Sequence, residues 1–138
     1  MIILDTNVIS ETRKINTGKS NPQVEEWLRR QDADDLYLSV ITISELEVGV
    51  LSMLRRDVQQ GTILRNWLNQ RVLVEFQDRI LPLGLEAARL AASMQVPDHK
   101  EANDAYIAAT ALACRCPVAT RNVKHFLSMG VQVINPWD

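Results

Sequence analysis

The stretch Met1-Ile2-Ile3-Leu4-Asp5-Thr6-Asn7-Val8 decides how this chain folds. Residues 2–4 are wholly apolar and mostly β-branched, which is typical of a strand buried at the centre of a parallel sheet. Helical signals follow at residues 7–11, so the chain passes from strand to helix at Asp5. In an open parallel α/β sheet the carboxyl ends of the strands face one crevice, where ligands bind. We therefore expect Asp5 at a ligand-binding edge.

The remaining chain repeats this alternation of strand and helix. Two helices around residues 43–54 and 64–72 are expected to form a hairpin, joined by a polar break at residues 57–62. Strands that alternate with helices point to a parallel sheet covered on both faces. We therefore expect an α/β fold of three layers, α/β/α, with a central, mainly parallel five-stranded sheet. The further strands are expected at residues 36–41, 79–83, 117–119 and 131–134.

The composition limits the class of protein. A length of 138 residues is typical of one domain, expected over residues 1–138, and 46% hydrophobic with 23% charged residues is ordinary for a globular protein. No apolar run reaches a bilayer-spanning length, and Asp5 comes too early for a signal peptide, so we expect a cytoplasmic protein that contacts no membrane. The net charge of −2 argues against broad electrostatic binding of duplex nucleic acid, although bound cations could supply positive charge locally.

Three acidic residues stand where predicted strands give way to helices: Asp5, Glu45 and Asp104. Glu45 follows the apolar run at residues 36–41, and Asp104 opens an Ala-rich run at residues 104–114 that is apolar nearly all round. Carboxylates gathered at one edge repel one another unless a cation joins them. Mg²⁺ or Mn²⁺ suits ligation by carboxylate and water oxygens alone. The constellation therefore predicts a divalent-metal site.

Each of these acids also has a purely structural interpretation. Asp5 could cap the helix after it, and Asp104 stands at a helix start, where the dipole favours negative charge. The stretch Thr42-Ile43-Ser44-Glu45 fits a capping box, in which Glu45 would accept a hydrogen bond from the Thr42 backbone N–H. Taken singly, each structural role explains its residue at least as well as metal binding does. The combination favours a metal, because burying several carboxylates is costly unless charge or hydrogen bonds offset it.

Several blocks of this sequence resemble, in order, those of PIN-domain ribonucleases, specifically toxins of the VapC and FitB type. Asp-Thr-Asn alone would be a weak signal, but blocks in register across the whole chain are a strong one. The blocks are Met1-Ile2-Ile3-Leu4-Asp5-Thr6-Asn7-Val8-Ile9-Ser10-Glu11, Leu38-Ser39-Val40-Ile41-Thr42-Ile43-Ser44-Glu45-Leu46, Asp104-Ala105-Tyr106-Ile107-Ala108-Ala109-Thr110-Ala111, Val118-Ala119-Thr120-Arg121-Asn122 and the ending Val133-Ile134-Asn135-Pro136-Trp137.

The resemblance implies an α/β/α PIN-like domain with endoribonuclease (hydrolase) activity that depends on Mg²⁺ or Mn²⁺. It implies that the protein is the toxin of a toxin–antitoxin pair and hydrolyses phosphodiester bonds of RNA. It also implies a homodimer inhibited by a small antitoxin encoded beside it. Such an antitoxin binds operator DNA through its own domain and covers the toxin's active site with a C-terminal segment, which gives a higher toxin–antitoxin assembly on the DNA.

Residue by residue, the resemblance carries the site onto this chain. Asp5, Glu45 and Asp104 match the acidic metal-site positions, Thr120 matches a hydroxyl residue beside the site, and Asn7 matches a polar residue that supports the first Asp. We expect Asp5 and Asp104 to hold the metal directly. Glu45 is expected to bind it directly or through a water molecule.

One position departs from the family's pattern. The family often has a fourth acid two residues after the position of Thr120, where this chain has Asn122. An amide offers a neutral oxygen but removes one negative charge, so we expect weaker binding of a second metal. Thr120 and Asn122 would position water or the leaving oxygen. Asp98 and Glu101 could partly substitute for the missing acid, although solvated loop charges explain them better.

The basic and aromatic residues are expected to have lesser roles. Arg121 could contact phosphate or be a plain surface residue. His99 and His125 are isolated in polar contexts, and we expect neither to be a catalytic base. Trp67 could lie at a dimer contact or pack in the core.

Two other functions fit parts of the pattern. Phosphatases that use a strand-end Asp need Asp-x-Asp after the first strand, and receivers need adjacent acids there, whereas this chain has Asp5-Thr6-Asn7. The non-enzymatic alternative is a catalytically weak or inactive PIN-fold interaction module that binds an antitoxin and regulates transcription through it. Asn122 would be the mark of lost activity in that module.

Overall fold

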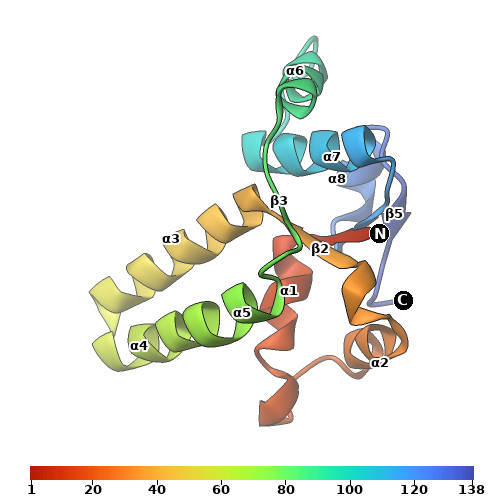
Figure 1. Cartoon of the computed structure of the whole chain (residues 1–138). Coiled ribbons are helices and arrows are strands. Elements are labelled where there is room, and N and C mark those ends of the chain that lie inside the picture. The colour runs from red at the N-terminus through yellow and green to blue at the C-terminus, as the bar shows by residue number, and fades with distance from the viewer.

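The first predicted strand lies at the centre of the sheet. In the computed structural model, which describes residues 1–138, β1 (Ile2–Leu4) pairs with β2 on one side and β4 on the other, and the strand order is β3-β2-β1-β4-β5 (Figure 1). Every pairing is parallel, so all five strands end at the same edge. The expected five-stranded sheet is confirmed, and it is parallel throughout. The other strands are β2 (Leu36–Ser39), β3 (Ile80–Leu81), β4 (Val118–Ala119) and β5 (Val133–Ile134).

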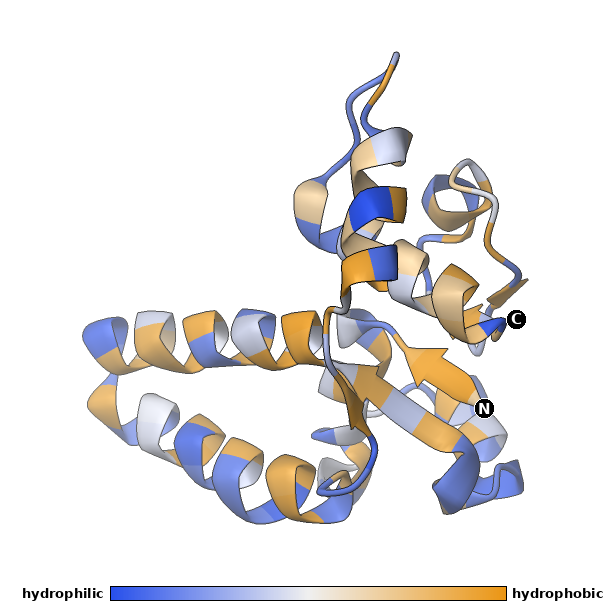
Figure 2. Ribbon diagram, turned by 45° about the horizontal axis from the view of Figure 1, so that its top comes forward, coloured by the Kyte–Doolittle hydropathy of each residue, from blue (hydrophilic) through white to orange (hydrophobic).

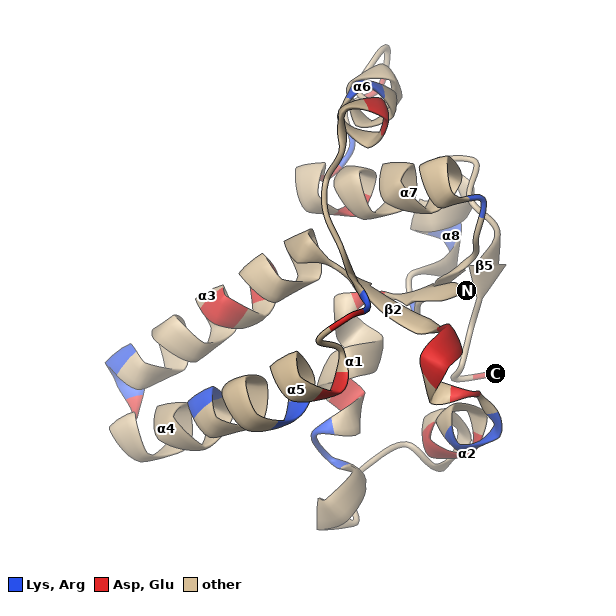
Figure 3. Ribbon diagram, in the orientation of Figure 1, with Lys and Arg blue, Asp and Glu red and all other residues tan.

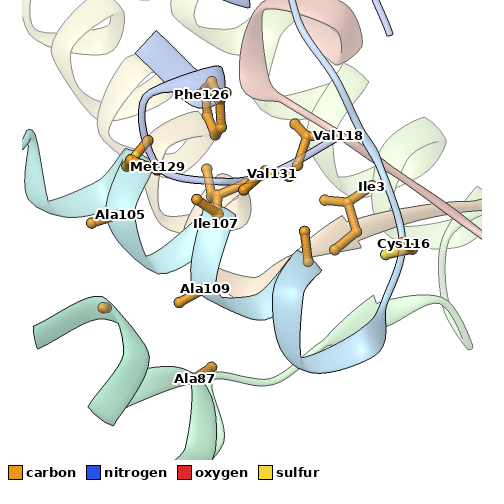
Figure 4. Packing of buried hydrophobic residues seen from close by; sticks show 13 residues of the cluster. Ile3, Ala87, Ala105, Ile107, Ala109, Cys116, Val118, Phe126, Met129 and Val131 are labelled. Carbon is orange, nitrogen blue, oxygen red and sulfur yellow. The ribbon is translucent and has the colours of Figure 1, made fainter. Parts of the chain in front are cut away.

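Helices cover both faces of the sheet, and β1 is buried on both sides. Ile3 is fully buried in the core of one face, and Leu4 is buried in the core of the other. Successive side chains of a strand point to opposite faces, so an uninterrupted apolar run fits a strand that is covered twice. Figure 4 shows the first core, in which Ile3 and Val118 from the sheet lie near Ile107 and Phe126 from the helices. The expected three-layer α/β/α arrangement is confirmed.

The helices divide between these two cores. Those on the face of Ile3 include the Ala-rich α7, most of which is buried, as its apolar sequence predicts. None of the helices is long and apolar enough to cross a membrane. The face of Ile3 carries α6 (Leu85–Met94), α7 (Ala102–Cys114) and α8 (Val123–Leu127), and the face of Leu4 carries α1 (Thr6–Thr12), α2 (Pro22–Arg30), α3 (Val40–Arg56) and α4 (Val58–Trp67), with the short 3₁₀ turns Ile15–Thr17 and Ala33–Asp35 beside it.

Helices α3 and α4 form the expected hairpin, which projects from the sheet (Figures 1 and 2). Apolar residues recur along both helices, and α4 continues through a π turn at Leu68–Val72 into α5 (Leu73–Glu75). The polar break expected at residues 57–62 is wrong, because the turn is made by Asp57 alone. Asp57 ends α3, and its side chain accepts a hydrogen bond from the Gln60 backbone N–H, which caps α4. One capping residue therefore suffices to reverse the chain.

Gly61 lies inside α4 where the two helices of the hairpin touch. A Cβ added there would lie 2.5 Å from the Leu54 Cα, which is far inside van der Waals contact. We expect Gly61→Ala to lower the free energy of unfolding by about 1–3 kcal/mol, because the clash is with backbone and the helices must separate. Gly49→Ala in α3 is the matched control, since nothing lies within 4 Å of its added Cβ. The control should gain about 0.5–1 kcal/mol from helix propensity, and urea unfolding showing equal effects would contradict the prediction.

The start of α3 differs from the expected one. The strand was expected to reach residue 41, but β2 ends at Ser39 and α3 begins at Val40. The Ser39 hydroxyl accepts a hydrogen bond from the Ile41 backbone N–H and so caps the helix. Thr42 lies buried inside α3, so the capping box proposed for Thr42 and Glu45 is wrong. Because the cap is already made, the Glu45 side chain is available elsewhere.

Candidate active site

Asp5 and Thr120 meet at the carboxyl edge of the sheet. Asp5 follows β1 directly and Thr120 follows β4 directly, and these two strands are neighbours. The Asp5 backbone N–H donates to the Ala119 carbonyl (2.9 Å), and the Thr120 Oγ1 hydroxyl donates to Asp5 Oδ2 (2.7 Å). Both side chains are buried, with exposed fractions of 3% for Asp5 and 0% for Thr120. The parallel register thus brings together two residues that stand 115 positions apart.

The Asp5 carboxylate is held by a network of donors. The Thr6 backbone N–H donates to Oδ1 (2.8 Å), and Asn7 Nδ2 donates to Oδ2 (3.2 Å). Asn7 Nδ2 also reaches Thr120 Oγ1 (3.4 Å), which accepts the Asn122 backbone N–H as well (3.0 Å). Asp5 therefore caps α1, as its structural interpretation predicted, and the same contacts fix the direction of its carboxylate. Capping and a role in the site do not exclude each other.

Glu45 comes from the first turns of α3 and points back toward the end of β1. Its Oε1 accepts a hydrogen bond from the Thr6 hydroxyl (2.6 Å). Thr6 is the residue after Asp5, so this bond ties the second acid to the first. The Thr6 hydroxyl also lies 3.4 Å from the Thr42 hydroxyl, one turn earlier on α3.

Asp104 joins the cluster from the first turn of α7. Its Oδ2 lies 3.2 Å from Nε2 of His125 on α8. The expectation that His125 is isolated is therefore wrong, because packing of α8 beside α7 brings the ring to Asp104. His99 lies on an exposed loop and makes no such contact.

Several negative charges act on one another in this region. The pKa of Asp104 is raised to about 7, chiefly by burial and then by the negative charges of Asp5, Glu101 and Glu45, in that order. The pKa of Asp5 is also raised, chiefly by burial, although its hydrogen bonds from Thr120 and Thr6 act in the opposite direction. In Figure 3 acidic positions on α3, on α7 and at the start of α1 lie around the carboxyl end of the sheet. The site is an acidic cluster that lacks a compensating Lys or Arg ion pair.

Glu101 and Asp98 differ in their relation to the cluster. Glu101 caps α7, because its carboxylate accepts the Asn103 (3.2 Å) and Asp104 (2.8 Å) backbone N–H groups. Helix α7 begins two residues before Asp104, and Glu101 is its N-cap. The negative charge of Glu101 also raises the pKa of Asp104. Asp98 is exposed and forms no hydrogen bond or ion pair, which agrees with a solvated loop charge.

The donor set fits a hydrated divalent ion. No three His, Cys, Asp or Glu side chains are placed closely enough to clasp one bare ion. Mg²⁺, however, keeps several waters and is bound through one or two carboxylates in many sites. Asp5 and Asp104 could hold such an ion, with Glu45 reaching it through water. The raised pKa values agree with this, because a cation would offset both the burial that chiefly causes them and the repulsion between the carboxylates that adds to it.

Asn122 lies at the rim of the cluster and not within it. Its backbone N–H reaches Thr120 Oγ1, while its side chain is exposed and forms no hydrogen bond. It lines a polar pocket with Lys124, His125 and Asn135, none of which was among the expected site residues. Asn135 directly follows β5, so the strand-end rule could have pointed to it, whereas the positions of Lys124 and His125 depend on where α8 lies relative to α7.

Comparisons with known proteins agree with this geometry. The family model for the PIN domain matches residues 2–130. The chain is 38% identical to VapC ribonuclease Y4jK of Sinorhizobium fredii, over 100% of this chain and 99% of that protein. It is 40% identical to toxin FitB of Neisseria gonorrhoeae, over 99% of each protein. The crystal structure of FitAcB from Neisseria gonorrhoeae superposes with a TM-score of 0.87 at 38% identity, over 99% of each chain. A structure of FitAB bound to an IR36 DNA fragment matches equally well, with a TM-score of 0.87 at 36% identity over 100% of this chain and 96% of that one.

Proposed function

This protein belongs to the PIN-domain family, and on that premise we propose that it is a metal-dependent endoribonuclease that acts as the toxin of a toxin–antitoxin pair. It would hydrolyse phosphodiester bonds of RNA and would act in the cytoplasm, where cellular RNA is found. The observation that carries the proposal is the convergence of Asp5, Glu45 and Asp104 beside Thr120 at the carboxyl edge of the sheet. Relatives named as a VapC ribonuclease and a FitB toxin support the same activity.

The chain's own residues prepare this site for hydrolysis. A bound Mg²⁺ or Mn²⁺ would lower the pKa of a coordinated water and stabilise charge on the phosphate. Asp5 and Asp104 would hold the ion. The hydroxyl of Thr120 and the amide of Asn7 keep Asp5 Oδ2 in one orientation, so little reorganisation is needed when the ion arrives.

Glu45 and Asp104 are oriented in the same way by neighbours. The Thr6 hydroxyl holds Glu45 Oε1, and His125 Nε2 lies within hydrogen-bond distance of Asp104 Oδ2, which leaves the other oxygen of each carboxylate free. Carboxylates that bind metals are commonly held by such second partners. We propose that Thr120 and Asn122 help to position water or the leaving oxygen, and the hydrogen bond from the Asn122 backbone N–H to Thr120 Oγ1 beside Asp5 supports this.

We further propose that a small DNA-binding antitoxin binds this protein and that the protein is a homodimer. The structure of FitAB bound to an IR36 DNA fragment supports an antitoxin partner and a larger assembly on operator DNA. An apolar cavity of about 440 Å³ opens at the C-terminal end of α1, away from the acidic cluster, and its walls include Ile9, Leu28, Trp67 and Phe76. The cavity lies between α1, α2 and the hairpin. Because its walls are largely apolar, we propose that an apolar segment of the antitoxin binds there.

Removal of metal tests the proposed activity. The purified protein should cleave a mixed RNA substrate in Mg²⁺ or Mn²⁺, and EDTA should slow cleavage by at least about 100-fold, because the carboxylates alone cannot activate water. Cleavage should return when metal is restored, and the rate should follow a single binding isotherm, since Asn122 removes a charge that would favour a second ion. Equal cleavage in EDTA would contradict the metal's role. Cleavage under none of these conditions would favour the inactive interaction module.

A further inference from the structure

A second pocket, whose residues have no part in holding the proposed metal, opens beside the acidic cluster. It is open to solvent, with a volume of about 570 Å³, and of its lining residues only Val123 is apolar. It is joined to the site at two points, where the Asn122 backbone N–H meets Thr120 Oγ1 and where His125 meets Asp104. The lining residues are Arg121, Asn122, Val123, Lys124, His125 and Asn135.

This pocket carries positive charge that has no ion-pair partner. Lys124 and Arg121 are both exposed, and neither forms a salt bridge with a carboxylate. Arg121 lies over the ring of Trp137, 5.4 Å from its centroid, which holds the guanidinium in place. Figure 3 shows basic colour on α8 behind α7. Some basic residues elsewhere pair with acids, as in Lys14–Glu11, Arg29–Glu25, Arg65–Glu47 and Arg79–Glu75, whereas others, such as the exposed Lys19, form no ion pair.

The side chains of this pocket suit an anion. Arg121 and Lys124 are donors without acceptor atoms, and the amides of Asn122 and Asn135 add further donors. An acid at position 122 would place a negative charge on this wall, whereas Asn122 keeps it neutral. A polyanion that approaches Asp5 and its acidic neighbours meets repulsion, which unpaired cations a few residues away would offset.

We propose that this pocket is a subsite of the ribonuclease that binds the phosphate next to the scissile one in single-stranded RNA. The inference rests on the proposed function, because it takes the acidic cluster as the place of cleavage. Lys124 and Arg121 contact the neighbouring phosphate, and His125 and Asn122 form the border between the two phosphates. The subsite therefore fixes the strand's position and contributes to binding more than to the chemical step.

Kinetics with substrates of two lengths test the subsite. For Lys124→Gln we expect kcat/KM on a pentanucleotide to fall about 5- to 10-fold, mainly through KM, because one phosphate contact is lost. A dinucleotide has only the scissile phosphate, so its cleavage should be unchanged. Lys19→Gln is the matched control, since Lys19 is also exposed and without an ion pair. A Lys124→Gln enzyme that matches the control on the pentanucleotide, or that loses as much on the dinucleotide, would overturn the subsite.

Binding measurements separate this inference from the proposed function. In the Asp5→Asn background, where cleavage is expected to stop, pentanucleotide affinity is measured at several salt concentrations with and without Lys124→Gln. The slope of log affinity against log salt should become shallower by about 0.7, as expected for one phosphate contact on a single strand. An unchanged slope would overturn the subsite even where the parent enzyme cleaves RNA. A shallower slope in a protein that never cleaves RNA would show that the pocket binds a phosphate but would contradict the ribonuclease, and with it the position of this phosphate next to a scissile one.

Discussion

Asp5→Asn should lower kcat/KM for RNA cleavage by about 1,000-fold or more while the protein remains folded. The change removes the charge of the most deeply buried acid in the cluster, and preorganised electrostatic groups of this kind commonly contribute 100- to 1,000-fold or more. Asn keeps an oxygen for the Thr6 backbone N–H, so the cap of α1 survives. The new amide nitrogen can donate to Thr120 Oγ1 in place of the long contact from Asn7 Nδ2 (3.4 Å), so this oxygen still accepts two hydrogen bonds. The measurement is initial rates in Mn²⁺ with circular dichroism of both proteins.

The control for this variant is Asp98→Asn, which removes a carboxylate that is exposed and makes no contact. It should leave the cleavage rate and the fold unchanged. Equal cleavage by Asp5→Asn and the parent would place the active centre elsewhere. A variant that loses activity together with its helical signal would report only misfolding, and metal binding by calorimetry on the folded fraction then decides whether Asp5 is a ligand.

Much of this arrangement follows from local patterns combined with one topological rule. Residues 2–4 are apolar without interruption because β1 is buried on both faces, and Asp5 comes where the strand ends, although it is still buried. Parallel strands share a carboxyl edge, so residues that follow separate strands meet there, as Asp5 and Thr120 do. The five strands could therefore be predicted. The roles of Thr120 and Asn122, in contrast, rest on resemblance to the family and stay predictions.

What could not be predicted depends on contacts between distant elements. The apolar residues Val40 and Ile41 continue β2 into α3 without a change of character, so periodicity did not separate strand from helix, and the Ser39 cap decides the boundary. The contact of His125 with Asp104 requires α8 to lie beside α7, which no spacing encodes. Glu45 fits a capping box by sequence alone, yet its partner is the Thr6 hydroxyl, 39 positions away. In each case the local sequence is compatible with more than one arrangement, and tertiary packing determines which one forms.

Asp104→Asn should abolish cleavage and yet make the metal-free protein more stable at pH 8. The pKa of Asp104 is raised from 3.8 to about 7, so its ionised form is less favourable in the folded state than in the unfolded chain. Because the folded state binds this proton more tightly than the unfolded chain, ionisation of Asp104 lowers the free energy of unfolding as pH rises from about 4 to 7. Above pH 7 the lowering is complete. The whole shift corresponds to about 4 kcal/mol. Solvent screening and the nearby His125 reduce it, so we expect a gain of about 1–2 kcal/mol from removing the charge.

Urea unfolding in EDTA at pH 4 and pH 8 measures this effect. The free energy of unfolding of Asp104→Asn should exceed that of the parent at pH 8. At pH 4, where Asp104 is protonated in the folded protein, the two values should differ little. Asp98→Asn is the exposed control. Its free energy of unfolding should equal that of the parent at pH 8 as well as at pH 4. Added Mg²⁺ should raise the stability of the parent by mass action and leave Asp104→Asn nearly unchanged, because the ion has lost a ligand. A variant less stable than the parent at pH 8 would mean that the Asp104 charge already has a compensating partner within the chain, and the need for a cation at this cluster would disappear.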